Sequence, residues 1–285
     1  MDGRARAPAA GTVLNALATG YGSAFAIEEY VTATVTLAGE SIRGEIAGRP
    51  AADTTLIEAA VRVVLESHGK SGGPDGATVR TESDVPPASG LKSSSAAANA
   101  TVLATLSALG VAESTSRENA ARLGVEAARE AGVTVTGAFD DASASMLGGL
   151  TLTDNTDDRL LSRDTVDWEV AVWLPPERAF SAEADVERCE RIAPVAEVVY
   201  DLAEAGNYAT AMTVNGLAFA PALRRPTEPM IEALPAAAGA SLSGTGPSYV
   251  AVGESAPIDA VAAQWGNRDG RTLRTRTQST GATIQ

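Results

Sequence analysis

Residues 86–97 read PPASGLKSSSAA, a loop of small residues that leads into the uninterrupted helical run AAANATVLA at 96–104. The first turn of a helix exposes unpaired backbone N–H groups and the positive end of the helix dipole. Glycine and serine allow a phosphate group to approach the backbone closely. The stretch therefore predicts an anion site, with a polyphosphate as the expected ligand.

Serine is also a common helix cap, so an ordinary capped turn is the alternative interpretation of this loop. Lys92 favours the binding site, because it is one of only two lysines in a chain that otherwise uses arginine. A scarce ammonium group inside a serine-rich loop is well suited to phosphate.

Composition excludes several classes of function. The chain has 285 residues, long enough for one large or two modest domains, and its formal net charge of −14 disfavours nucleic acid and anionic membranes as partners. That acidic balance is also typical of proteins from halophiles. One cysteine and one histidine exclude an internal disulfide and make a histidine-based triad or zinc site untenable. The N-terminus lacks an apolar signal core, so we expect a cytoplasmic protein.

The pattern of apolar residues predicts alternating strands and helices. Strands are expected at 25–27, 31–37, 77–82, 166–174, 249–252 and 271–277, and helices at 53–68, 96–109, 116–131, 182–205, 208–219, 226–234 and 258–265. The charged turn DNTDDR at 154–159 suggests a boundary between two domains, 1–155 and 156–285.

Two further stretches carry polar residues in apolar surroundings. VTVTGAFDDASASMLGGL, at 133–150, contains Asp140 and Asp141 and no other charged residue. Paired aspartates are often solvated turn residues, but carboxylates at the edge of a buried element are usually functional or paired. SLSGTGPSYVAVG, at 241–253, places a glycine-rich turn before an alternating strand.

The three stretches, in this order, resemble the motifs of the GHMP kinase superfamily, and the Lys-Ser-Ser-Ser form of the loop most resembles its archaeal type of shikimate kinase. The resemblance implies an α+β fold of the two-layer α/β sandwich type, with a ribosomal-protein-like N-terminal domain and a ferredoxin-like C-terminal domain. It also implies a phosphotransferase that uses ATP and Mg²⁺ to phosphorylate the 3-hydroxyl of shikimate. Another small-molecule kinase of the superfamily, such as homoserine kinase, and a non-catalytic nucleotide-binding sensor remain alternatives.

The resemblance also implies roles for individual residues. The ATP phosphates would contact the loop residues Pro86, Pro87, Ala88, Ser89, Gly90, Leu91, Lys92, Ser93, Ser94, Ser95 and Ala96. The residues expected beside phosphates and substrate are Thr12, Ser243, Gly244, Thr245 and Gly246.

The catalytic acid or base is expected among the paired aspartates, together with Lys92. Asp141 lies seven residues before Gly148, as in related kinases, whereas Asp140 better fits the spacing from Gly137. Ser94 with Glu126, or alternatively Glu130, would hold Mg²⁺. The Ala7-Pro8 pair and the turn and strand at 20–27 resemble the first family motif, but the Gly-Glu-His of several members is absent, which argues against sugar and mevalonate substrates. The sequence does not single out an arginine for a substrate carboxylate.

Overall fold

The computed structural model describes residues 1–69, 75–86, 89–134, 137–177 and 184–285. It begins with a long hairpin of β1 (Asp2–Leu14) and β2 (Tyr21–Leu37), paired from Asp2 opposite Thr36 to Leu14 opposite Ser23. The two short strands predicted at 25–27 and 31–37 are parts of the single strand β2. Arginines alternate with buried small residues at the start of β1, which is why this segment also forms a strand.

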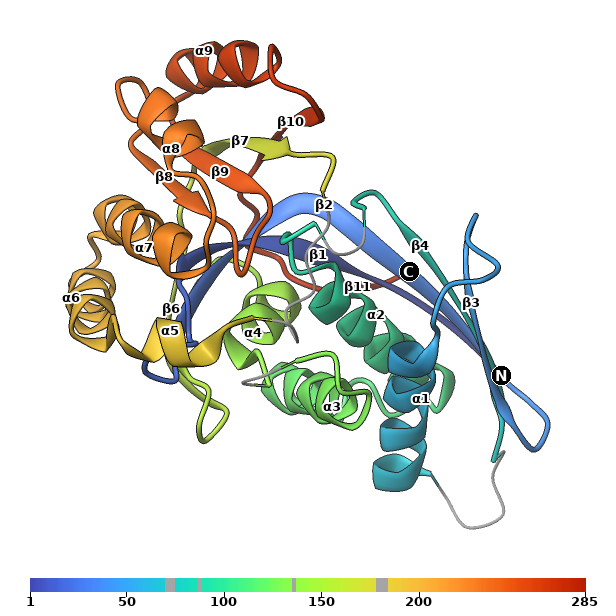
Figure 1. Ribbon diagram of the computed structural model, residues 1–285. Helices are drawn as coiled ribbons and strands as arrows, with labels where there is room; N and C mark the ends of the chain where they lie inside the picture. Colours follow the sequence, from blue (N-terminus) through green and yellow to red (C-terminus); the bar gives the residue numbers. More distant parts are fainter. Residues whose placement is uncertain (70–74, 87–88, 135–136, 178–183) are drawn as a thin grey trace.

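The hairpin is the centre of the first sheet, which within the described residues has seven strands (Figure 1). The main strand order is β11-β1-β2-β4-β3, and β5 pairs with both β2 and β6. The bounds of the added strands are β3 Ile42–Ile46, β4 Ala77–Ser83, β5 Leu150–Asp154, β6 Arg159–Asp164 and β11 Thr283–Ile284. The pairing is antiparallel except between β3 and β4, which are parallel and joined by a helix.

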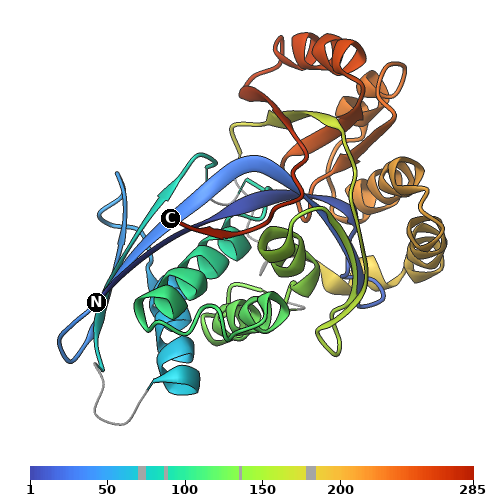
Figure 2. The ribbon, with the colours of Figure 1, turned by 180° about the vertical axis from the view of Figure 1, so that it is seen from behind.

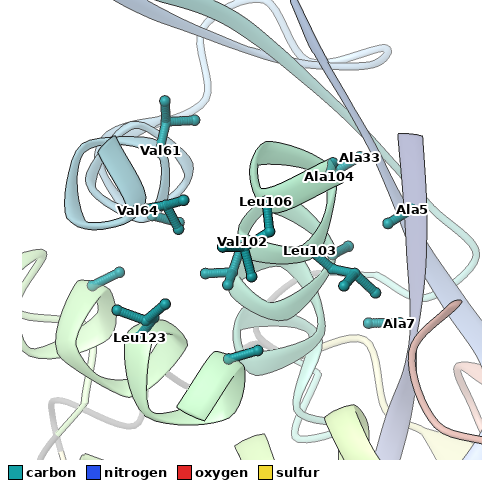
Figure 3. Close-up of a cluster of buried hydrophobic side chains, with 14 of the residues drawn as sticks. Ala5, Ala7, Ala33, Val61, Val64, Val102, Leu103, Ala104, Leu106 and Leu123 are labelled. Atoms are coloured by element: carbon teal, nitrogen blue, oxygen red, sulfur yellow. The ribbon is translucent and has the colours of Figure 1, made fainter. Parts of the chain in front are cut away.

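Helices cover one face of this sheet (Figures 1 and 2). They are α1 Thr55–His68, α2 Ser93–Ala108, α3 Arg117–Glu130 and α4 Phe139–Leu147. Helix α2 lies in the middle, and Figure 3 shows its Val102, Leu103 and Leu106 between the strands and the neighbouring helices. Gly3 permits close packing of β1 against α2, since a Cβ added there would lie 2.0 Å from the Ala104 carbonyl oxygen.

The second sheet has the order β10-β7-β9-β8 and is antiparallel throughout. Its strands are β7 Glu169–Leu174, β8 Gly239–Leu242, β9 Tyr249–Gly253 and β10 Arg271–Arg276. Helices α5 Val186–Glu190, α6 Ala193–Glu204, α7 Tyr208–Ala222 and α8 Glu228–Ala233 separate β7 from β8, and α9 Ser255–Trp265 separates β9 from β10. Along the chain, these strands and helices follow the ferredoxin-like order βαββαβ, as predicted, when α5 to α8 are counted as one helical connection.

The structure corrects the helix expected over 182–205. Two helices, α5 and α6, occupy its described part, and the chain turns between them at Arg191 and Ile192. Pro194 lies in the first turn of α6, where its missing N–H costs no hydrogen bond, and this position favours a new helix start over continuation of α5.

The chain is not divided at a single point between the two sheets. The boundary expected at 155–156 falls in the turn between β5 and β6, which pair in the first sheet, and the second sheet starts only at Glu169. After β10 the chain returns to the first sheet as β11. One core cluster contains residues of both units, including Phe25 of β2 and Phe219 of α7. No helix in the described part of the chain is long and apolar enough to cross a membrane.

Candidate active site

The serine-rich loop leads directly into α2, and the first turn of this helix has no side-chain cap among the described residues. Gly90 and Lys92 both have positive φ, +82° and +60°, and α2 begins at Ser93 directly after Lys92. The N–H groups of its first turn are therefore left for a ligand, and the side chains of Ser93, Ser94 and Ser95 line a cavity at this point.

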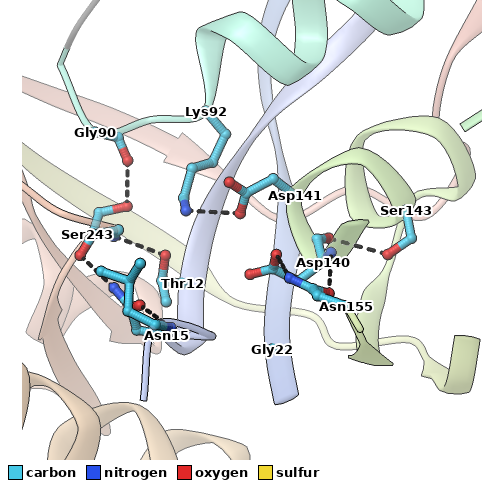
Figure 4. Close-up of polar contacts among 12 residues, drawn as sticks. Thr12, Asn15, Gly22, Gly90, Lys92, Asp140, Asp141, Ser143, Asn155 and Ser243 are labelled. Carbon is cyan, nitrogen blue, oxygen red and sulfur yellow. Dashed lines mark hydrogen bonds and ion pairs between the residues drawn. The ribbon is translucent and has the colours of Figure 1, made fainter. Parts of the chain in front are cut away.

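Lys92 reaches across this cavity to the start of α4 (Figure 4). Its Nζ lies 2.7 Å from Oδ1 of Asp141, and each side chain is only 11% exposed. The pKa of Asp141 is raised to about 7, first by burial and then by the charge of Asp140, against the lowering influence of Lys92. Burial acts to lower the pKa of Lys92, but the charges of Asp141 and Asp140 outweigh it, so that this pKa is raised.

Asp140 has a different set of partners. Nδ2 of Asn155 donates to its Oδ1 at 2.7 Å, and its backbone N–H donates to Oδ1 of Asn155 at 3.1 Å. Its carboxyl group also packs against β2, where a Cβ added at Gly22 would lie 2.6 Å from the Asp140 Cγ. The two neighbouring carboxyl groups thus line the same cavity and interact with each other, but each also has a partner of its own, Lys92 for Asp141 and Asn155 for Asp140.

The glycine-rich loop at 243–248 packs against the serine-rich loop. The Ser243 hydroxyl donates to the Gly90 carbonyl at 2.8 Å, and the Ser248 hydroxyl donates to the carbonyl of Ser89. The Gly244 N–H donates to the Thr12 hydroxyl at 2.8 Å. Ser243 and Ser248 therefore hold the two loops together, whereas Thr12 ties the glycine-rich loop to β1. The neighbouring Gly244 and Thr245 line the cavity.

The cavity measures about 810 Å³ and joins two kinds of lining. One part is polar and contains Asn15, Lys92, Asp140, Asp141, Gly244 and Thr245. The other part is formed where α1 and the segment before it cross the sheet, and it mixes apolar with polar and charged side chains: Val31, Ile46, Leu56, Ile57 and Val85 with Arg49, Asp53, Thr81, Ser83 and Asp84. The start of α2 lies with its serines along the same cavity, so a long ligand could contact both parts at once.

Several predicted site residues lie behind the lining instead of on it. Pro86, Gly90 and Lys92 line the cavity, whereas Ser89, Leu91 and Ala96 are buried beneath the loop. Gly246 faces Leu242 and Arg225. Pro87 and Ala88 lie outside the described residues.

The structure does not bring Glu126 to the cavity. Its side chain is exposed on α3, because the buried face of that helix consists of small and apolar residues such as Leu123, Gly124 and Ala127. Glu130 is also on the surface, with Arg62 at 3.3 Å. We therefore retain no metal role for either glutamate.

The sequence analysis missed a set of buried amides. Asn15 donates through Nδ2 to the Gly244 carbonyl at 2.9 Å, and its N–H donates to Oδ1 of Asn215 at 2.9 Å. Asn155 binds Asp140 as described above. Each is almost fully buried, and buried amides nearly always have hydrogen-bond partners. An asparagine within an apolar run, as in TVLNAL and MTVNGL, was the available signal.

Comparisons with known proteins identify the family of this chain. The model of a family described as GHMP kinases N terminal domain matches residues 55–149. A shikimate kinase of Halobacterium salinarum is 62% identical over 99% of this chain and 99% of its own. A shikimate kinase of Methanothrix thermoacetophila is 50% identical over 99% of this chain and 96% of its own.

Solved structures show the same fold at low identity. The mevalonate kinase of Methanococcus jannaschii superposes with a TM-score of 0.77 at 15% identity, over 96% of this chain and 98% of its own. A homoserine kinase of Cytophaga hutchinsonii superposes with a TM-score of 0.76 at 18% identity, over 100% of this chain and 97% of its own. At such identities the likeness concerns the fold alone.

Proposed function

This chain belongs to the GHMP kinase superfamily and, within it, to the archaeal type of shikimate kinase, and from this membership we propose that it transfers the γ-phosphoryl group of ATP to the 3-hydroxyl of shikimate. The observation that carries the proposal is the ion pair of Lys92 and Asp141 in the same cavity as the uncapped start of α2. That cavity has room for both a polyphosphate and an acceptor.

The start of α2 binds the ATP phosphates in this proposal. The N–H groups of its first turn, the hydroxyls of Ser93 to Ser95 and the ammonium of Lys92 all stabilise negative charge on the phosphate oxygens. Apolar side chains in the other part of the cavity, such as Val31, Ile46 and Leu56, suit the adenine ring.

Asp141 takes the proton of the reacting hydroxyl. As the substrate oxygen bonds to the γ-phosphorus, the bond from that phosphorus to the bridging oxygen breaks, ADP leaves, and the hydroxyl proton passes to the Asp141 carboxylate. A pKa of about 7 suits a general base near neutral pH. Lys92 orients this carboxylate and is placed to offset negative charge on the transferred group.

The residues present fit a magnesium ion carried by ATP. Mg²⁺ prefers oxygen ligands and is commonly held by substrate phosphates with few protein groups. The Ser94 hydroxyl lines the cavity and would contribute one ligand, and the described residues contain no cluster of three acidic, histidine or cysteine side chains that could hold the ion alone. When bound, the ion would neutralise charge on the phosphates.

Substrate profiling tests the proposal directly. ADP release, measured with shikimate, homoserine and mevalonate as acceptors, is expected only with shikimate, with shikimate 3-phosphate as the product. Turnover of homoserine instead would identify another kinase of the superfamily. ATP binding without turnover of any acceptor would indicate the non-catalytic sensor.

A variant with both Asp140→Asn and Asp141→Asn separates binding from chemistry. It is expected to lose turnover while its affinity for ATP stays within about threefold of wild type, because the phosphates contact the loop. Full activity of this variant would remove the aspartates from the mechanism.

A further inference from the structure

Asn155 lies at the turn between β5 and β6 and is 2% exposed. Its Oδ1 accepts hydrogen bonds from the Thr153 hydroxyl at 2.8 Å and from the Asp140 N–H at 3.1 Å. Because a backbone N–H can only donate, the atom that the Asp140 N–H reaches must be the amide oxygen. The amide nitrogen is thereby fixed on the opposite side, where it donates to Oδ1 of Asp140 at 2.7 Å.

Asp140 and Asp141 are adjacent buried carboxylates. Among the described residues, Lys92 is the one ammonium group that lies beside them. A buried carboxylate without a donor is costly, so each of the two would be drawn to Lys92 if nothing else bound it. The Asn155 amide gives Asp140 a separate partner. Gly22 leaves the space in which the Asp140 carboxyl group packs, on the side of β2.

We propose that Asn155 is a positioning residue for phosphoryl transfer, which holds Asp140 through Oδ1 so that Asp141 alone pairs with Lys92. The inference rests on the proposed function, in which Asp141 accepts the substrate proton. Asn155 acts on the reaction only through Asp140, and this makes a sharp test possible.

The test exchanges donor and acceptor across the contact. Asn155→Asp keeps the size of the side chain and an oxygen for Thr153 and the Asp140 N–H, but it turns an oxygen toward the Asp140 carboxylate. We expect kcat with shikimate to fall at least tenfold while KM for ATP stays within twofold. In the variant that combines Asp140→Asn with Asn155→Asp, the new amide at 140 can donate to the new carboxylate at 155. Its kcat should lie within twofold of that of Asp140→Asn alone.

Two results would overturn the inference. One is an Asn155→Asp variant with kcat within twofold of wild type. The other is an equal loss from Asn155→Asp in the wild-type and the Asp140→Asn backgrounds, because additive effects indicate that the two residues do not act as a unit.

A matched control is Asn267→Asp, which makes the same change on an amide that donates to the Ala263 carbonyl on the exposed end of α9. Its kcat is expected to stay within twofold of wild type. Urea unfolding of wild type, Asn155→Asp, Asp140→Asn and the combined variant gives a second double-mutant cycle, in unfolding free energy, that does not require turnover. If wild-type protein does not phosphorylate shikimate, the proposed function fails, and an additive unfolding cycle would still overturn the pairing of Asn155 with Asp140.

Discussion

The side-chain nitrogen of Lys92 lies 2.7 Å from a carboxylate oxygen of Asp141, so that the start of α2 and the first turn of α4 meet through one buried ion pair. Lys92 comes from the serine-rich loop and Asp141 from the stretch at 133–150. The ion pair therefore connects the proposed phosphate site with the proposed base.

The pH dependence of turnover should follow Asp141. Because its pKa is raised to about 7 and the base must be ionised, kcat is expected to rise as pH increases through about 7. Stability should respond in the opposite direction. Between the ordinary aspartate pKa of 3.8 and the raised pKa of about 7, the folded protein holds a proton that the unfolded chain has lost, so Asp141 favours folding less as pH rises. Measurement of kcat from pH 5.5 to 8.5 at constant ionic strength checks the first expectation. The residual turnover of Asp141→Asn should lack this rise of kcat with pH.

Replacement of Lys92 should shift the pH at which kcat rises. In Lys92→Met the opposing charge is gone, so burial and Asp140 raise the pKa of Asp141 further and the midpoint moves to higher pH. At neutral pH we expect kcat to fall by about 10²- to 10³-fold, the range for loss of one preorganised charge-stabilising group. Lys92→Arg should not restore it, because Nζ lies in a confined place where a Cβ at Gly244 would be 2.9 Å away. If kcat of Lys92→Met rose at the same pH as that of wild type, this account of Asp141 would be wrong.

Gly22→Ala tests the space that Asp140 needs. Alanine normally improves a strand by about 0.5–1 kcal/mol relative to glycine. Here the new methyl group would meet the Asp140 Cγ at 2.6 Å, so we expect a net loss of about 1–3 kcal/mol in unfolding free energy and at least a tenfold loss of kcat. In an Asp140→Ala background the same change should cost far less stability, since the clashing atoms are absent. Urea unfolding and steady-state kinetics provide both values.

Gly90→Ala tests the contact between the two loops. Gly90 has φ of +82°, and a Cβ there would lie 2.7 Å from the Ser243 carbonyl oxygen. Strain and clash should displace the serine-rich loop and raise KM for ATP at least tenfold. Ser243→Ala removes only the hydroxyl that donates to the Gly90 carbonyl, so it should cost about 1 kcal/mol of stability with a smaller rise in KM. Equal KM values for Gly90→Ala and wild type would exclude the loop from ATP binding.

Salt should stabilise this protein. With a formal net charge of −14, repulsion among carboxylates opposes the compact state, and salt screens it over about 8 Å at 0.15 M and about 3 Å at 1 M. We expect the Tm to rise by several degrees between 0.1 and 2 M KCl, with much of the rise below 1 M. Thermal unfolding followed by circular dichroism measures this, and a Tm that falls with salt would contradict it.

The order of the three motifs led to the family, the α+β fold and the kinase activity. Relatives matched over nearly the whole chain confirm the family and the activity, and the structure with its solved neighbours confirms the fold. Local patterns also located most elements. The helix expected over 96–109, for example, follows from the alanine-rich run there, a feature of neighbouring residues alone, and the structure starts it three residues earlier, at Ser93.

The sequence determined which chemical groups are available, namely a serine-rich helix start, one loop lysine and two adjacent aspartates, because these are read along a single stretch of chain. Only the tertiary structure decided how the groups are paired. Asp141 binds Lys92 and Asp140 binds Asn155 because α4, α2 and the turn after β5 are packed against β2, and no local pattern encodes that contact. The same packing turned Glu126 to the surface, since the small residues of α3 were needed to cover the neighbouring helices.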